Sequence, residues 1–344
     1  MPSIARLVGR LGGSAVGLAP VGRLALHATG VHGCVFFLHR FHEPGREPPG
    51  DHPALLAANL AWLRRIGVDL VTVETIVRAG LEGRVLPRPS VAFTIDDGYR
   101  DFLTVAAPVF ERYDCPATVF LATEFLDRRR MLWWDRVEWI VLGTRRPRLT
   151  LAIGAHHVDE AVPAARSGRT ALAARCSRAM EHVADTEKVA LIDALAAQLE
   201  VEVPAEAPEA FAPLTWDEVR ALHARGFQFA PHTVTHPILA QTSDAQCADE
   251  VATSVRRLRE EVARPTPILA YPNGRPYAFG LREERVVAEN GLLAAVTTDG
   301  AWLRRGVPGP DAPFRVGRVP YFEEPYRFRA SVLGLFGRPS PSTS

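Results

Sequence analysis

The stretch Ser90–Tyr99 (S-V-A-F-T-I-D-D-G-Y) decides the fold class of this 344-residue chain. Its first six residues are rich in β-formers and predict a buried strand. Two adjacent carboxylates, Asp96 and Asp97, follow the strand and precede a glycine. Side chains of neighbouring strand residues diverge, so one carboxylate can bind a metal ion while the other faces a water molecule. The alternative is a polar turn in which one aspartate caps the next helix.

Short apolar strands and amphipathic helices alternate on both sides of this stretch. Six or seven parallel β/α units of this kind predict a barrel-like α/β fold. In such folds the chemistry gathers where strands end and loops begin. The predicted strands are residues 34–39, 69–73, 90–95, 117–121, 227–230, 267–270 and 292–297.

The alternation breaks after Thr123 and resumes near Leu214. Ordinary connections between strands and helices are roughly 2–6 residues long, so residues 124–213 are predicted to be an insertion. It contains helical patterns at 131–142, 171–183 and 186–201 and a polar β-like patch at 149–158. Three tryptophans in its first helix form either a sugar-stacking wall or ordinary core; they are Trp133, Trp134 and Trp139.

A second group of polar residues, His232–Pro237 (H-T-V-T-H-P), follows another predicted strand. Two histidines four residues apart can face the same way, and imidazole is the commonest metal ligand. The pair alone is weak evidence, but its position at a strand end matches that of Asp97. Asp97, His232 and His236 would form a set of two histidines and one carboxylate with open positions for water and substrate.

The third group, Tyr271-Pro272-Asn273-Gly274, also follows a predicted strand. Proline and glycine favour a tight loop, and such a loop can direct a backbone N–H at a developing oxyanion. A plain turn is the alternative. Trp302, after Thr298-Asp299-Gly300, is a further candidate for sugar contact, with a core role as its alternative.

In this order, T-I-D-D-G, H-T-V-T-H and A-Y-P-N-G resemble the motifs of polysaccharide deacetylases of carbohydrate esterase family 4. The resemblance covers about 35–319 apart from the insertion. It implies a distorted (β/α) barrel of seven strands, with a domain at about 31–330. It implies Asp96 as the base and Asp97, His232 and His236 as ligands of a divalent metal ion, with Zn²⁺ favoured over Co²⁺, Ni²⁺ or Fe²⁺.

The same resemblance implies a hydrolase that removes N-acetyl groups from amino sugars of a polysaccharide or glycan precursor. The loop residues Tyr271, Pro272 and Asn273 would contact the substrate or its oxyanion. An O-acetyl esterase and a catalytically silent glycan-binding homologue are the alternatives.

The chain departs from the usual family pattern at two positions. Ala270 stands where an arginine usually orients the base, and no histidine follows His236 to act as the usual late acid. A subset resembling bacterial exopolysaccharide N-deacetylases carries its acid histidine near the N-terminus. In Phe37–His42 (F-L-H-R-F-H), His39 is the expected acid and His42 the alternative. Arg318 resembles a late arginine of the same subset and would orient Asp96.

Composition limits the partners and the compartment. A net charge of +1 argues against a bulk electrostatic contact with nucleic acid. Four widely spaced cysteines predict thiols in a reducing compartment, hence the cytoplasm, with export as the alternative. The segment 1–30 is interrupted by arginines, which argues against a membrane span. It is predicted to be an amphipathic or packing segment, which could contact the inner membrane surface, with a signal peptide as the alternative. The tail 338–344 is predicted to be disordered, and the oligomeric state is not indicated.

Overall fold

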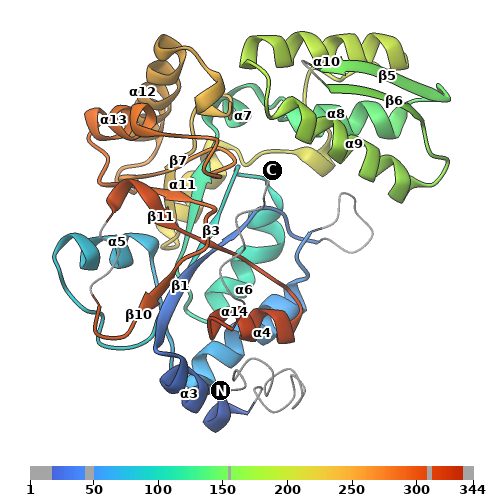
Figure 1. The fold of residues 1–344 in the computed structure, drawn as a ribbon. Helices are drawn as coiled ribbons and strands as arrows, with labels where there is room; N and C mark the ends of the chain where they lie inside the picture. Colours follow the sequence, from blue (N-terminus) through green and yellow to red (C-terminus); the bar gives the residue numbers. More distant parts are fainter. Residues whose placement is uncertain (1–17, 43–49, 154–155, 308–311, 336–344) are drawn as a thin grey trace.

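The computed structural model describes residues 18–42, 50–153, 156–307 and 312–335. Strands and helices alternate along most of this chain, as the sequence predicted (Figure 1). The predicted disordered tail, 338–344, and residues 1–17 of the predicted N-terminal segment lie outside the described residues.

Mostly parallel strands form two sheets that approach each other at both edges. The larger sheet runs β10-β1-β3-β4-β7, with β2 beside β3 and β12 beside β1, and the smaller runs β11-β9-β8. The Thr266 N–H, two residues before the start of β8, donates to the Phe229 carbonyl of β7 (2.7 Å). At the other edge, β11 pairs with β9 and β12 pairs with β1. The strands therefore follow an open, distorted barrel, which confirms the predicted α/β class. Their bounds are β1 (Val31–Leu38), β2 (Asp69–Val71), β3 (Ser90–Ile95), β4 (Ala117–Leu121), β7 (Gln228–Pro231), β8 (Ile268–Ala270), β9 (Ala294–Thr297), β10 (Trp302–Arg304), β11 (Val316–Gly317) and β12 (Val319–Pro320).

Alternate residues of the strands pack into two different hydrophobic clusters. Phe93 and Ile95 of β3 pack in the cluster that also holds residues of the surrounding helices, whereas Ala92 packs in a cluster shared with the other barrel strands. Since side chains on a strand alternate with period two, Thr94 and Asp96 lie on the same face as Ala92. The strand pattern thus directs Asp96 towards the interior of the barrel. That interior cluster includes Val35, Ala92, Phe120, Ala230, Ile268, Ala294 and Val316.

Helices cover the outside of the barrel (Figure 1). Helix α5 starts at Val73 because the Thr72 hydroxyl accepts the Thr75 N–H (3.1 Å) and caps the helix there. A full capping box between Thr215 and Glu218 opens α11. The helix bounds are α3 (Ala19–Thr29), α4 (Pro53–Ile66), α5 (Val73–Leu81), α6 (Ala107–Arg112) after the π-helix η1 (Phe102–Ala106), α7 (Thr123–Arg128), α11 (Trp216–Ala224), α12 (Asp244–Glu261), α13 (Leu281–Glu289) and α14 (Pro325–Val332), with short 3-10 turns η2 (Glu209–Phe211), η3 (Leu239–Gln241) and η4 (Pro313–Arg315).

A separate helical unit, α8 to α10, lies beside the barrel at the upper right of Figure 1 and is called the insertion unit below. It has its own hydrophobic core. The polar patch predicted there is an antiparallel hairpin, β5–β6. Trp139 packs against Phe211, and its indole N–H donates to the Glu202 carbonyl (3.1 Å), so it has the packing role. The bounds are α8 (Trp133–Gly143), β5 (Arg148–Ile153), β6 (His156–Ala161), α9 (Arg166–Met180) and α10 (Asp185–Leu199).

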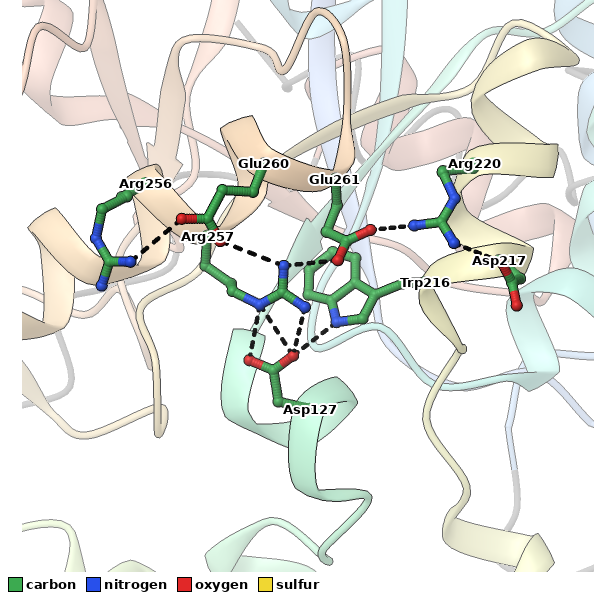
Figure 2. A network of polar contacts seen from close by, with 8 residues as sticks. All are labelled: Asp127, Trp216, Asp217, Arg220, Arg256, Arg257, Glu260 and Glu261. Atoms are coloured by element: carbon green, nitrogen blue, oxygen red, sulfur yellow. Dashed lines mark hydrogen bonds and ion pairs between the residues drawn. The ribbon is translucent and has the colours of Figure 1, made fainter.

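Helix α7 falls within the predicted insertion but is fastened to the barrel helices α11 and α12 (Figure 2). Asp127 accepts hydrogen bonds from the Arg257 guanidinium (2.9 Å) and the Trp216 indole (2.7 Å), and Arg257 lies over the Trp216 ring (4.6 Å). Arg220 links the two barrel helices through Glu261. The insertion unit therefore departs from the barrel after α7.

Helix α3 packs against α4 and leaves Leu18 and Leu24 more than half exposed (62% and 68%). Within the described ranges, no helix is both long enough and apolar enough to cross a bilayer. The four cysteines are buried and unpaired, as predicted.

Candidate active site

The candidate residues meet in one cavity of about 430 Å³ at the carboxyl ends of the parallel strands. His39 follows β1, Asp96 and Asp97 follow β3, His232 follows β7, and Tyr271 follows β8. All five line this cavity. The strand ends that the sequence singled out are thus brought together by the barrel.

Asp97, His232 and His236 each direct one possible ligand atom at the same point. The Nε2 atoms of His232 and His236 lie 3.6 and 3.5 Å from Asp97 Oδ1 and 3.1 Å from each other. His232 Nδ1 lies 2.7 Å from the Ala270 carbonyl, which can only accept, so Nδ1 carries the proton and Nε2 carries the lone pair. Asp97 Oδ1 is buried and has no hydrogen-bond partner. A divalent cation with nitrogen and oxygen ligands fits this arrangement.

Burial controls the protonation of all three side chains. Burial lowers the pKa of His232 to about 4, although Asp96 opposes this shift, and burial with the neighbouring His232 lowers the pKa of His236 well below its usual value. Both imidazoles are therefore neutral near pH 7, as metal ligation requires. Burial, together with Asp96 and Asp135, raises the pKa of Asp97 well above its usual range. A bound cation would offset this shift, because it favours the charged carboxylate.

Left-handed backbone conformations at non-glycine residues gather around the cavity. Asp97 (φ 75°), Thr233 (φ 68°), His236 (φ 59°) and Asn273 (φ 64°) all have them. Each costs about 1 kcal/mol or more and persists only where the surroundings impose it. The strain is most evident at Thr233, since a β-branched side chain is least tolerant of positive φ.

Asp96 forms a buried bidentate ion pair with Arg318. Nη1 and Nη2 of Arg318 donate to the two carboxylate oxygens (2.7 and 2.9 Å), and Nη1 also donates to the Thr94 hydroxyl (3.0 Å). The guanidinium lies between the rings of Phe37 and Phe120, 5.2 and 5.5 Å from their centroids. Burial alone would raise the pKa of Asp96, but Arg318, together with His232 and His39, outweighs burial and holds that pKa well below its usual range. Asp96 is therefore an oriented carboxylate anion.

His39 stands beside this ion pair. Its Nε2 lies 3.9 Å from Asp96 Oδ2, and its side chain is 47% exposed to the cavity and solvent. Protein atoms around the ring lower the pKa of His39, with Asp96 opposing the shift and Arg318 adding to it. The alternative acid, His42, instead stacks on His52 with ring centroids 5.8 Å apart, and it does not line the cavity.

Comparison with known proteins places this site in a family. The sequence profile of the polysaccharide deacetylase family matches residues 83–162 and 172–290. The chain belongs to the polysaccharide deacetylase family. This confirms the family resemblance that its three motifs indicated.

Individual relatives are more distant. The poly-β-1,6-N-acetyl-D-glucosamine N-deacetylases of Escherichia coli strains K12 and O157:H7 are 30% identical over 97 residues, which are 24% of this chain and 14% of theirs. This chain thus matches only a small part of these relatives. Two solved structures have the same fold: the Streptococcus pyogenes deacetylase PplD in complex with acetate (TM-score 0.56, 17% identity, 87% of this chain and 97% of that chain) and IcaB from Ammonifex degensii (TM-score 0.55, 16% identity, 88% and 97%).

The loop after β8 reaches the cavity with two of its three predicted residues. Tyr271 stacks on Phe279 (centroids 4.3 Å apart), and its hydroxyl is buried without a hydrogen-bond partner. Asn273 also lines the cavity. Pro272 is buried in the turn and is not part of the cavity lining.

Trp302 does not lie at the site, which corrects the expectation of a sugar contact there. It is in β10 and pairs with Cys34 near the start of β1, whereas His39 follows the end of that strand. Its indole N–H donates to the Ser331 carbonyl (2.7 Å), which is a packing role. The aromatic wall comes from the insertion unit instead: Trp133 and Trp134 line the cavity, and the Trp134 ring lies 4.6 Å from that of His236.

Two acidic residues at the site have no sequence motif. Glu250 of α12, 5% exposed, accepts the N–H groups of Val234 and Thr235 (2.8 and 2.9 Å) and the Thr235 hydroxyl (2.6 Å). It thereby holds the turn between the two histidines. The only sequence signal is a glutamate on the apolar face of an amphipathic helix.

The second residue, Asp135, comes from the insertion unit and lines the cavity. Its carboxylate accepts the Tyr99 hydroxyl (2.6 Å), and burial raises its pKa to about 7. Tyr99 directly follows the Asp96-Asp97-Gly98 motif, so the insertion unit contacts the motif itself.

Proposed function

We propose that this protein hydrolyses the N-acetyl groups of amino sugars in a polysaccharide of the poly-N-acetylglucosamine type, with a divalent metal ion held by Asp97, His232 and His236. The observation that carries the proposal is the convergence of these three ligand atoms within 4.8 Å of one another, beside a carboxylate that an arginine holds in place. The names of the bacterial relatives support an N-acetylglucosamine polymer as the substrate class.

When bound, the ion would supply a Lewis acid that polarises the acetyl carbonyl and acidifies the attacking water. Asp96 then accepts the proton of that water as general base. Arg318 keeps Asp96 ionised and fixes both carboxylate oxygens, so that the base is oriented before the substrate arrives. The backbone N–H of Asn273 is the proposed additional donor to the developing oxyanion.

The leaving amine needs a proton as the C–N bond breaks. His39 is the proposed donor, because its Nε2 lies 3.9 Å from the proposed base and its ring faces the cavity. Burial lowers the pKa of His39, so its imidazolium would give up a proton readily, while the Asp96 carboxylate opposes that shift and favours the protonated ring. Asp96 and His39 thus form the proposed base and acid pair.

Zinc is the proposed ion, since two neutral imidazoles and one carboxylate are typical of catalytic zinc sites; cobalt, nickel and iron(II) remain the alternatives. Acetyl ester hydrolysis would use the same residues, and the amide is proposed because the relatives are N-deacetylases. A silent homologue is disfavoured by the intact set of base and ligands.

The test is acetate release by the zinc-loaded protein from β-1,6-linked N-acetylglucosamine oligomers and, separately, from acetylated xylan. We expect acetate from the amino sugar only, its loss after dialysis against a chelator, and its return with zinc. Asp96→Asn should keep one metal ion per chain and lose at least about 100-fold in kcat. Acetate from xylan alone would establish the esterase, and near-normal turnover by Asp96→Asn would refute the base.

A further inference from the structure

A second cavity, of about 650 Å³, lies between the barrel and the insertion unit. Thr235, Gln246 and Glu250 line it from the barrel side, and Trp133 and Val189 line it from the insertion unit. Its volume is in the usual range of small-molecule sites. Neither the sequence motifs nor the proposed mechanism uses it.

The two cavities are separated by very little protein. Trp133 lines both of them, and the neighbouring residues Thr235 and His236 line one each. The turn between the histidines therefore has the proposed metal ligands on one side and the second cavity on the other. A ligand longer than one sugar that occupied the first cavity would have the second as its nearest extension.

Two of the cationic groups that line the second cavity are paired with carboxylates of the same lining. Lys188 Nζ lies 3.4 Å from Asp185 and 4.7 Å from the centre of the Trp133 ring, and Arg136 donates to Asp193 (2.8 Å). A strongly ionic ligand would thus find few uncompensated charges. A neutral, hydroxyl-rich ligand fits better, since its hydroxyls can donate to the carboxylates and accept from the ammonium and guanidinium groups.

The side chain of Gln246 shows that this boundary is built from both units. In a full capping box, the Gln246 side chain would return a hydrogen bond to the Ser243 backbone. Ser243 does accept the Gln246 N–H (3.2 Å), but the Gln246 amide instead donates to Asp185 of α10 (2.8 Å). The barrel and the insertion unit are therefore joined by polar contacts that line the cavity.

We propose that the second cavity is a carbohydrate subsite that binds another N-acetylhexosamine residue of the same polysaccharide chain. The insertion unit thereby makes the enzyme selective for polymer over short oligomers. The identity of the sugar in this proposal rests on the proposed function.

The test narrows the cavity without touching the proposed active site. Val189, 49% exposed, lines the second cavity only, so Val189→Trp should fill it. Ala194→Trp on the same helix is the matched control, because Ala194 is exposed and lines neither cavity. Circular dichroism checks that the variants fold. If Val189→Trp does not fold, the smaller substitution Val189→Phe takes its place.

The measurement is kcat/KM for β-1,6-linked N-acetylglucosamine oligomers of increasing length. In the unmodified enzyme we expect an increase of at least about tenfold from disaccharide to hexasaccharide, as for one additional well-bound sugar. Val189→Trp should abolish most of this increase and leave the disaccharide unchanged, while Ala194→Trp behaves like the unmodified enzyme. Equal length dependence in Val189→Trp and the unmodified enzyme, or no length dependence at all, would overturn the subsite.

Calorimetric binding of the hexasaccharide to zinc-loaded Asp96→Asn protein, with and without Val189→Trp, separates the two proposals. If no protein releases acetate but Val189→Trp still weakens binding about tenfold, the proposed function fails and the subsite stands. If acetate is released and binding is unaffected by Val189→Trp, the subsite fails and the function stands.

Discussion

Replacing Glu250 by alanine should weaken metal binding without touching a metal ligand. The substitution removes the carboxylate that accepts the N–H groups of Val234 and Thr235 and the Thr235 hydroxyl. Without this carboxylate, the turn between the histidines is no longer held in place. Thr233 and His236 in that turn have strained left-handed conformations, so their backbone strain falls when the turn relaxes. We therefore expect the turn of Glu250→Ala to populate conformations in which the two imidazoles no longer converge.

The magnitude follows from the burial of the carboxylate and from its three hydrogen bonds. Hydrogen bonds to a charged acceptor contribute roughly 1.5–3 kcal/mol each. Two effects reduce the sum: burial raises the pKa of Glu250 and so weakens its charged form, and the second cavity gives water a path to the freed N–H groups. A net loss of about 2 kcal/mol remains, which corresponds to a metal dissociation constant about 30-fold higher.

The assay is competition for zinc with a chromogenic chelator, which reads metal affinity independently of turnover. Glu250→Gln is the matched control, because its amide oxygen can accept both N–H groups and its amide nitrogen can donate to the Thr235 hydroxyl. It should stay within about threefold of the unmodified protein, which is under 1 kcal/mol. A folded Glu250→Ala protein with unchanged zinc affinity would refute the reasoning, as would an equal loss in both variants.

Three further predictions concern the walls and the proton carriers of the site. Arg318→Met should shift the acid limb of the pH–rate profile to higher pH. Arg318 lowers the pKa of Asp96, so the base is protonated at a higher pH when Arg318 is absent. An unshifted limb would exclude this role of Arg318. His39→Ala should lower kcat about 100-fold or more with unchanged zinc stoichiometry, and full activity would remove it as the acid. Trp302→Phe should lower the unfolding temperature and leave kcat/KM unchanged, whereas Trp134→Ala should mainly raise KM. A raised KM in Trp302→Phe with an unchanged KM in Trp134→Ala would show that the sugar contacts Trp302.

The sequence determined the local part of this structure. Strand residues alternate with period two, and polar residues at the ends of parallel strands meet at one edge, so Asp96, Asp97, His232 and His236 could be grouped before any coordinates were considered. Their identities and spacing also indicated the family. These features depend only on neighbouring residues and on the parallel class of the sheet.

Only the tertiary structure decided the partners that come from distant segments. Arg318 is a partial exception: the family resemblance predicted that it orients Asp96, 222 residues away, but the bidentate geometry of that ion pair comes from the structure. Glu250 reaches the histidine turn from the face of another helix, while Trp302 packs away from the cavity. The physical reason is that a period of two or 3.6 residues specifies which face of an element is buried. Which distant residues contact that face depends on the register and packing of whole elements.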